Sequence, residues 1–273
     1  MLKIHTLERI WRKYISWRPQ YYKKVYISQR YLENYRDIID KTDELKNLRF
    51  KKRYTFSIAD KDTAVITFQD IFVNQCYRIS DPAHKEVIVD IGANIGLFSL
   101  YALFKAPQAK IFAIEANPFT FQILKKNVEE NLLMGKIEVH NLAIYSKQEK
   151  VKIFCHKISG WSSLFNVGNL QKGAIQNIEA MPLSMFCKHH GIKKIDYLKM
   201  DCEDAEYDIV LRDANFFNIP IMEISMEVNK SPVNAQGCFS DLIGCLCSHY
   251  RSVSIRGKGQ FVIVSCRRLK SSE

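Results

Sequence analysis

From residue 86 onward, short apolar segments that fit buried strands alternate with longer stretches of helical periodicity. Strands are expected at residues 87–91, 110–114, 136–140, 195–200, 219–228, 252–255 and 261–264, and helices are expected to begin near residues 95, 118, 205 and 239. Strands that alternate with helices form parallel sheets covered on both faces. The order therefore predicts an α/β fold, with a doubly wound, mostly parallel seven-stranded sheet in a main domain over residues 86–273.

The positive charge of the chain is concentrated before this domain. The net charge is +11, but residues 1–55 alone hold 15 basic and 6 acidic side chains. We expect a basic, aromatic-rich helical extension over residues 1–55, which either packs on the main domain or a second copy of the chain, or contacts an anionic membrane. The nearly neutral remainder makes nucleic acid an unfavoured partner. Residues 54–58 and 64–68 alternate in polarity around a polar turn and predict a hairpin in a cap segment over residues 56–85.

The cysteines and the apolar runs give an expectation about location. Eight cysteines are scattered without a C-x-x-C pair or histidines at zinc spacing, so we expect free thiols in a reducing cytosol. Charged residues interrupt the first apolar stretch, and the longest apolar run, residues 95–104, is too short to cross a bilayer. The expected location is the cytoplasm, with peripheral contact at the inner face of the membrane as the second option.

The loop after the first strand is the main candidate for a cofactor site. It reads D-x-G-x-x-x-G from Asp90 to Gly96, which has fewer glycines than a dinucleotide loop and adds a carboxylate. A second acid, Glu115, ends the next strand, where such folds hold a ribose diol. Asn141 and Ala143 follow the third strand and could flank an adenine. This set fits S-adenosylmethionine (SAM) better than NAD, and the candidate cofactor contacts are Asp90, Gly92, Ala93, Asn94, Gly96, Glu115, Ala116, Asn117, Asn141, Ala143 and Asp201.

Six blocks of sequence, in order, resemble the FkbM family of SAM-dependent methyltransferases. They are DIGANIGLFS at 90–99, EANP at 115–118, NLAI at 141–144, SSL at 162–164, IDYLKMDCEDAE at 195–206 and MEVN at 226–229. The resemblance covers about residues 85–230 and implies a class I, Rossmann-like methyltransferase that releases S-adenosylhomocysteine (SAH) after O-methylation of a sugar, glycan or natural product. Asp204 stands where the family has glycine in its K-x-D-x-E-G-x-E block.

Acids at two strand ends are the candidate catalytic groups. A methyl transfer to a hydroxyl needs alignment of the nucleophile and a base for its proton. We expect Asp201 to act as the base or on the cofactor side, with Glu203 and Glu227 orienting the acceptor; His140 and His156 are alternative bases. Asp201 and Glu227 could also bind Mg²⁺ with Asn229, an option that we do not favour.

An insertion at about residues 145–184 interrupts the alternation and is the candidate acceptor-binding region. It contains a hairpin-like strand at residues 150–154 and a polar loop with Trp161, Ser162 and Ser163. Trp161 would stack on a sugar face or anchor the core.

Two other functions remain open. An RNA ribose O-methyltransferase would use the basic extension to contact phosphates, and a nucleoside-binding interaction module would not catalyse a reaction. The block at 201–204 lacks the Asn/Asp-Pro-Pro-aromatic pattern of base N-methyltransferases, which disfavours that class.

Overall fold

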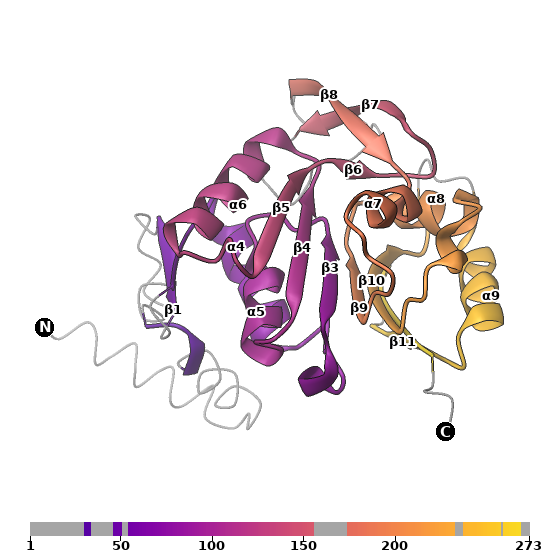
Figure 1. The fold of residues 1–273 in the computed structure, drawn as a ribbon, viewed down its shortest axis with the longest axis horizontal. Helices are drawn as coiled ribbons and strands as arrows, with labels where there is room; N and C mark the ends of the chain where they lie inside the picture. The colour runs from indigo at the N-terminus through magenta and orange to yellow at the C-terminus, as the bar shows by residue number, and fades with distance from the viewer. Residues whose placement is uncertain are drawn as a thin grey trace, which may run out of the picture.

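The central feature of the fold is a seven-stranded sheet (Figure 1). The computed structural model describes residues 30–33, 46–50, 54–155, 174–232, 237–257 and 259–268. The strands of this sheet, in spatial order, are β11 (Ser252–Arg256), β12 (Phe261–Arg267), β10 (Glu223–Asn229), β9 (Tyr197–Met200), β3 (Val87–Ile91), β4 (Lys110–Glu115) and β5 (Ile137–Asn141). Strand β12 runs antiparallel to both of its neighbours, and the other pairs are parallel. The predicted doubly wound sheet is confirmed.

Helices cover both faces of this sheet because successive strand residues point to opposite sides. Ile88 and Ile111 enter one core with helices α5 (Leu97–Lys105) and α6 (Pro118–Glu130). Val89 and Phe112, one residue further along each strand, enter a second core. Helices α7 (Leu183–His189), α8 (Ala205–Arg212) and α9 (Phe239–His249) contribute to that second core. The near-continuous apolar strands in the sequence reflect this burial on both faces.

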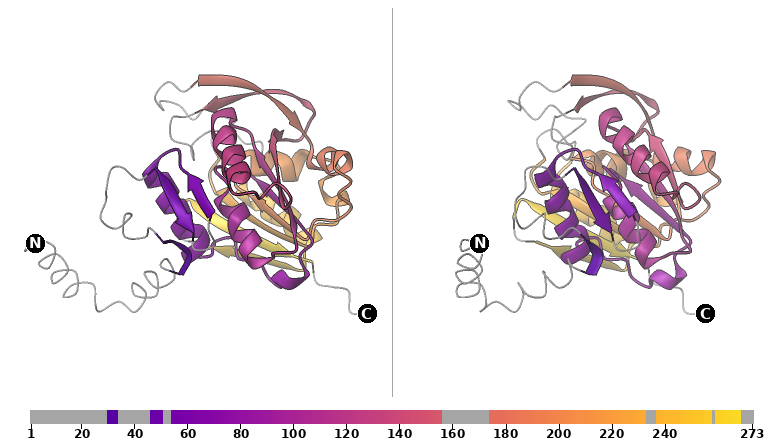
Figure 2. Two further views of the ribbon diagram at one scale, coloured as in Figure 1. Left: turned by 60° about the vertical axis from the view of Figure 1, so that its left-hand side comes forward. Right: turned by 90° about the vertical axis from the view of Figure 1, so that its left-hand side faces the viewer.

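A cap segment precedes the sheet and packs on the α6 side (Figure 2). Strand β1 (Asn47–Phe50) pairs antiparallel with β2 (Tyr54–Ser57), and helix α4 (Lys61–Phe68) continues into a π-helical turn, Gln69–Val73. The side chain of Asn127 in α6 fixes this cap by accepting from the backbone N–H of Ser57 and donating to its carbonyl, at 2.7 and 3.0 Å.

The hairpin predicted from residues 54–58 and 64–68 is wrong in its second strand. The side chain of Asp60 caps the first turn of α4 by accepting from the Thr63 N–H at 2.8 Å, which starts a helix there. Ala64 and Phe68 are then buried at helical spacing. The true partner of β2 is β1, a strand inside the range expected to be helical; the rest of the expected extension lies mainly outside the described residues.

The insertion forms a small sheet of its own beyond the end of β5, at the top of Figure 1. Its strands are β6 (Ala143–Ile144), β7 (Glu149–Cys155) and β8 (Ala174–Met181), in the order β6-β8-β7, with β7 and β8 antiparallel. This confirms the hairpin-like strand expected at residues 150–154. Trp161, Ser162 and Ser163, like His156, lie outside the described residues.

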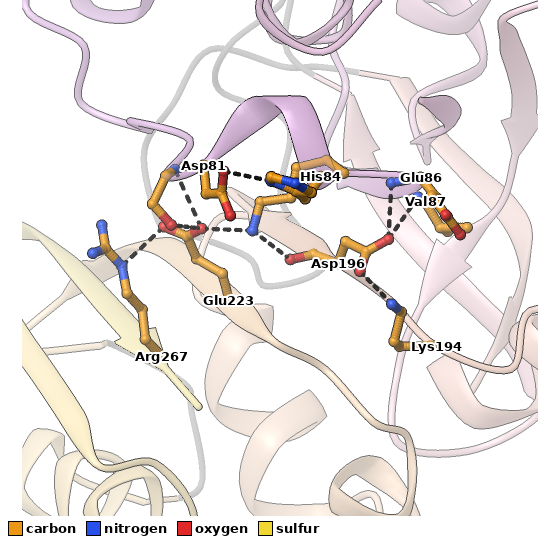
Figure 3. Close-up of polar contacts among 10 residues, drawn as sticks. Asp81, His84, Glu86, Val87, Lys194, Asp196, Glu223 and Arg267 are labelled. Carbon is orange, nitrogen blue, oxygen red and sulfur yellow. Dashed lines mark hydrogen bonds and ion pairs between the residues drawn. The ribbon is translucent and has the colours of Figure 1, made fainter. Parts of the chain in front are cut away.

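The amino ends of the parallel strands carry a separate polar network (Figure 3). Glu223, the first residue of β10, accepts from Lys85 and Arg267 at 3.1 and 3.2 Å, and from the Ser80 hydroxyl at 2.5 Å. Asp196 accepts from the backbone N–H groups of residues 86 and 87. This network ties three strands together at the edge opposite their carboxyl ends, so Glu223 is structural and not part of a ligand site there.

Two further features of the described residues bear on the expectations from sequence. None of their helices combines the length and the apolar character needed to cross a bilayer. Seven cysteines are free thiols, namely Cys76, Cys187, Cys202, Cys238, Cys245, Cys247 and Cys266.

Candidate functional site

A cavity of about 820 Å³ lies at the carboxyl ends of β3, β4, β9 and β10. This edge of an open parallel sheet is where ligands bind in doubly wound folds. The cap segment closes part of the cavity, because residues of α4 and of its π-helical turn line it together with the strand ends.

The loop between β3 and α5 forms one wall of the cavity through two glycines. Gly92 has φ +71°, and a Cβ at this position would lie 1.8 Å from the backbone oxygen of Asp201. Gly96 has φ +94°, where a Cβ would lie 2.9 Å from Leu124. Both positions need glycine for conformation, and Gly92 also needs it for space. The loop therefore lets two backbone segments approach closely beside the cavity.

Glu115, the last residue of β4, is held by the neighbouring loops. One carboxylate oxygen accepts from the N–H of Asn94 and the other from the N–H of Asn117, both at 2.8 Å. Burial raises the pKa of Glu115 to about 7, although these two hydrogen bonds act in the opposite direction. Each oxygen keeps a second lone pair, so the side chain can accept two hydroxyl hydrogen bonds from a ribose that enters the cavity.

Asp90 departs from the sequence-based interpretation. It is fully buried, does not line the cavity, accepts from the Ser99 hydroxyl at 2.7 Å and lies 3.3 Å from the Lys199 ammonium. Its strand position turns the carboxylate under the loop and not toward the ligand. Asp90 is thus a positioning residue that fixes Lys199 and the first turn of α5, and the direct cofactor contact expected of it is not available.

Lys199 brings a permanent positive charge beneath the cavity. Its ammonium donates to the carbonyl of Gly92 at 2.6 Å and lies 3.7 Å from a carboxylate oxygen of Asp201. Although burial alone would lower it, Asp90 and Asp201 raise the pKa of Lys199. Lys199 therefore stays charged and connects the loops after β3 and β9.

Asp201 is held at the cavity from two sides. The hydroxyl of Tyr77, a buried residue of the segment before β3, donates to Asp201 at 3.0 Å, and Lys199 lies on the same oxygen. The side chain of Asp201 is 36% exposed, so it remains open to a ligand.

Glu203 and Glu227 line the same cavity and repel Asp201. Burial, followed by the charge of Asp201, raises the pKa of Glu227 to about 7 and that of Glu203 to about 9. At neutral pH Glu203 therefore favours its protonated form, and the pKa of Glu227 lies close to the ambient pH. The cavity thus offers a hydrogen-bond donor and a group that can accept a proton.

The loop after β9 bends through two non-glycine residues in left-handed conformation. Glu203 has φ +53° and Asp204, at the start of α8, has φ +76°. Glu206, buried and outside the cavity lining, accepts from the N–H of Cys202 at 2.5 Å and closes the loop. The backbone at Asp204 keeps the left-handed conformation that glycine adopts readily, so the substitution in the family block does not abolish the turn.

Replacing Asp204 should reveal the cost of that conformation. Both Asp204→Gly and Asp204→Ala remove the side chain, but only glycine relieves the left-handed strain. We expect Asp204→Gly to exceed Asp204→Ala by about 1 kcal/mol in free energy of unfolding, measured in urea. Equal stabilities of the two variants would contradict the left-handed assignment.

Most, but not all, of the predicted cofactor and catalytic residues meet at the cavity. Those that line it are Gly92, Ala93, Asn94, Glu115, Ala116, Ala143, Asp201, Glu203 and Glu227. Gly96 supports the loop without lining it. Asn117 caps α6, and Asn141 donates to the carbonyls of Glu115 and Ala116, so both shape the backbone around the cavity.

The structure supports neither His140 as the base nor a magnesium site at the cavity. His140 does not line the cavity, because it packs against Phe112 and Phe186 on the other side of β5, and it is not placed to act as the base. Asn229 does line it, but its amide oxygen already accepts from Gln260 and Ser231. With that oxygen engaged and Lys199 beside Asp201, the set does not fit Mg²⁺, which needs several free oxygen ligands.

Sequence reasoning missed the contribution of the cap segment. Tyr77 and Cys76 reach the cavity from before β3, and Asp60, Thr63 and Asp70 reach it from α4 and the turn that follows. No motif marks these residues. In the sequence Tyr77 is only an aromatic residue shortly before the first strand. Nothing there indicates its contact with Asp201, which is 124 positions away.

The sheet order, with antiparallel β12 between β10 and β11, and a ligand cavity after β3, defines the fold of class I SAM-dependent methyltransferases. A family model described as the methyltransferase FkbM domain matches residues 90–252, more than half of the chain. The chain belongs to the FkbM methyltransferase family and is a methyltransferase.

Curated relatives and solved structures carry related names. The chain is 27% identical over 238 residues to the 31-O-demethyl-FK506 methyltransferase FkbM of Streptomyces tacrolimicus, covering 76% of this chain and 89% of that protein. It is 27% identical over 186 residues to the methyltransferase sdnD of Sordaria araneosa, covering 58% and 72%. A solved methyltransferase FkbM from Methylobacillus flagellatus KT aligns with a TM-score of 0.47 at 14% identity, covering 72% of this chain and 47% of that one.

Proposed function

We propose that this chain transfers a methyl group from SAM to a hydroxyl of a sugar, glycan or natural product. The observation that carries the proposal is the presence, in one cavity, of Glu115 at the ribose position and of Asp201, Glu203 and Glu227 at the adjoining strand ends. SAM carries positive charge at its sulfur and its amine, and a cavity with an excess of carboxylates favours a cationic ligand.

The chain offers SAM both space beside the loop after β3 and hydrogen-bond acceptors for its ribose. The backbone around Gly92 leaves a cradle that a Cβ would fill, and Glu115 offers two oxygens to a diol. When bound, SAM supplies a methyl group that its sulfonium makes electrophilic. Asp201, fixed by Tyr77 and Lys199 at the cavity wall, would contact the bound cofactor or orient the acceptor.

Glu227 is the general base in this proposal, in place of the Asp201 expected from the sequence, because Tyr77 and Lys199 already engage the Asp201 carboxylate. It accepts the proton of the acceptor hydroxyl as the new oxygen–carbon bond forms and the carbon–sulfur bond breaks, with SAH as the product. A pKa of about 7 suits a base that works near neutral pH. Glu203, which keeps its proton at neutral pH, orients the acceptor as a hydrogen-bond donor.

The outer part of the cavity supports an acceptor with both apolar and hydroxyl-bearing faces. Ile66 and Phe261 line it although they are 61% and 54% exposed, and Asp60 and Gln260 lie among the same lining residues. Exposed apolar side chains next to polar ones are typical of surfaces that bind a ligand. The Streptomyces relative is named as a methyltransferase of 31-O-demethyl-FK506, and this name supports an acceptor oxygen.

Label transfer from methyl-labelled SAM tests the proposal. The purified chain is incubated with fractions of neutral glycans, small-molecule alcohols and RNA, and products are examined by mass spectrometry for the addition of one methylene unit. We expect label in a glycan or alcohol fraction, and label incorporated about a hundredfold or more slowly when Glu227→Gln replaces the wild type. Label confined to RNA, lost at high salt, would instead support the ribose O-methyltransferase that the basic residues 1–55 suggest. SAH binding without transfer to any fraction would favour the nucleoside-binding module.

Contact with an anionic membrane remains a proposal based on charge alone. Residues 1–55 carry an excess of nine basic side chains, each of which contributes about 1 kcal/mol near an anionic surface. Co-sedimentation of the full chain with phosphatidylserine vesicles should occur at low salt and decline at high salt. A chain that ignores such vesicles at low salt would leave packing on the main domain or dimer contact as the role of this segment.

A further inference from the structure

Two histidines and a glutamate meet on the outer side of β5, away from the cavity. Glu138 and His140 share one face of this edge strand, since they are two residues apart, and His190 follows the last turn of α7. Among the described residues, this is the one group of three histidine, cysteine or acidic side chains whose ligand atoms all lie within 4.8 Å of one another. None of the three lines the methyltransferase cavity.

The two nitrogen–oxygen separations in the cluster match those of a zinc site. Nε2 of His140 and Nδ1 of His190 each lie 3.2 Å from Oε1 of Glu138. Tetrahedral zinc, with bonds of about 2.0–2.2 Å to nitrogen and oxygen, places its ligand atoms roughly 3.3 Å apart. Nε2 of His140 is buried and has Oε1 of Glu138 as its polar neighbour, so this nitrogen is directed into the cluster.

Neighbouring side chains hold these ligands in place. The ring of His140 packs 5.0 Å from Phe186 and the ring of His190 packs 4.3 Å from it, measured between centroids. Lys110 donates to the other oxygen of Glu138 at 2.6 Å, which leaves Oε1 facing the two imidazoles. Hydrogen bonds of this kind to a ligating carboxylate orient it in known metal sites.

We propose that Glu138, His140 and His190 bind a divalent transition metal of the zinc type, with water in the fourth position. Two imidazoles and one carboxylate are a ligand set that zinc accepts. The ion would link the edge strand of the sheet to the end of α7, elements 50 residues apart at His140 and His190. Its role in this proposal is to stabilise the fold and is independent of methyl transfer.

Zinc titration of the chelator-treated full chain tests the site, with thermal unfolding as a second readout. We expect about one equivalent to bind and to raise the Tm, because a ligand that binds only the folded state stabilises it. His190→Ala removes an exposed ligand and Glu138→Gln keeps the shape of its side chain, so both should fold. Each should weaken binding by about tenfold or more and lose most of the zinc-dependent rise in Tm.

His189→Ala is the matched control, because His189 is an exposed histidine next to His190 that does not belong to the cluster. It should bind zinc as the wild type does. Cobalt(II) provides a spectroscopic check, since its visible spectrum reports tetrahedral coordination. The proposal is overturned if the wild type takes up no zinc, or if binding survives both ligand substitutions, which would place the metal on other groups such as thiols.

Discussion

Gly92→Ala should abolish SAH binding, with affinity reduced by about a hundredfold or more. The added Cβ would meet the backbone oxygen of Asp201 at 1.8 Å, and backbone cannot yield as a flexible side chain can. The loops after β3 and β9 must then separate, which moves Gly92 and Asp201 apart at the cavity wall. Isothermal titration of SAH into the variant, with circular dichroism to confirm folding, measures this effect.

Gly191→Ala is the control for the backbone conformation itself. Gly191 also has a positive φ, +65°, but a Cβ there would meet no atom within 4 Å. It should show a small loss of stability from left-handed strain and normal SAH affinity. If Gly92→Ala binds SAH as well as Gly191→Ala does, the close approach of the two loops is not needed for the site.

Glu227→Gln should lower kcat by about 10²- to 10⁴-fold, the range expected when a general base is removed. The fold should survive, because glutamine keeps the shape and no longer resists burial as a charge. Glu129→Gln, an exposed glutamate on α6, is the control for a charge change of the same kind and should keep full activity. Turnover on the acceptor identified by label transfer provides the measurement.

The pH profile of the wild type gives an independent readout of the same base. Burial and Asp201 raise the pKa of Glu227 to about 7, and only the ionised form can accept a proton. The value of kcat/KM should therefore rise with pH up to about 7 and level off above it, and this rise should be absent from the residual activity of Glu227→Gln. Near-normal rates in both Glu227→Gln and Asp201→Asn would mean that the base lies elsewhere, with His156 as the next candidate.

The periodicity of the sequence was enough to predict the sheet but not the secondary structure inside the cap segment. Parallel strands buried on both faces have a strong apolar signal. The loop from Asp90 to Gly96 indicated the edge of the sheet where the cavity lies, because it follows the first strand. Residues 64–68 alternate in polarity as a strand does, yet the Asp60 cap and the packing against Phe72 make them helical. Local pattern alone does not reveal which tertiary contacts will override it.

The site residues that lie at strand ends could be predicted from the sequence, whereas those that depend on tertiary contacts could not. The carboxylates at 115, 201, 203 and 227 were found because each follows or ends a strand at one edge. The burial of Asp90 against Lys199 was not predicted. The side chain of a strand residue can point to either face of the sheet, and both faces are apolar here. Tyr77, and the meeting of His140 with His190, depend on chain segments that only the fold brings together.

The central claim is that SAM binds at the carboxyl ends of β3 and β4, and titration of SAH into the wild type and Glu115→Ala tests it most directly. Glu115 lies at the cavity with two oxygens free to accept further hydrogen bonds, and its own partners are backbone N–H groups of two adjacent loops. We predict saturable binding of SAH to the wild type and binding about tenfold or more weaker to Glu115→Ala, as expected when charge-assisted hydrogen bonds to a diol are lost. Equal affinity of the two proteins, or no binding of SAH by the wild type, would contradict the account.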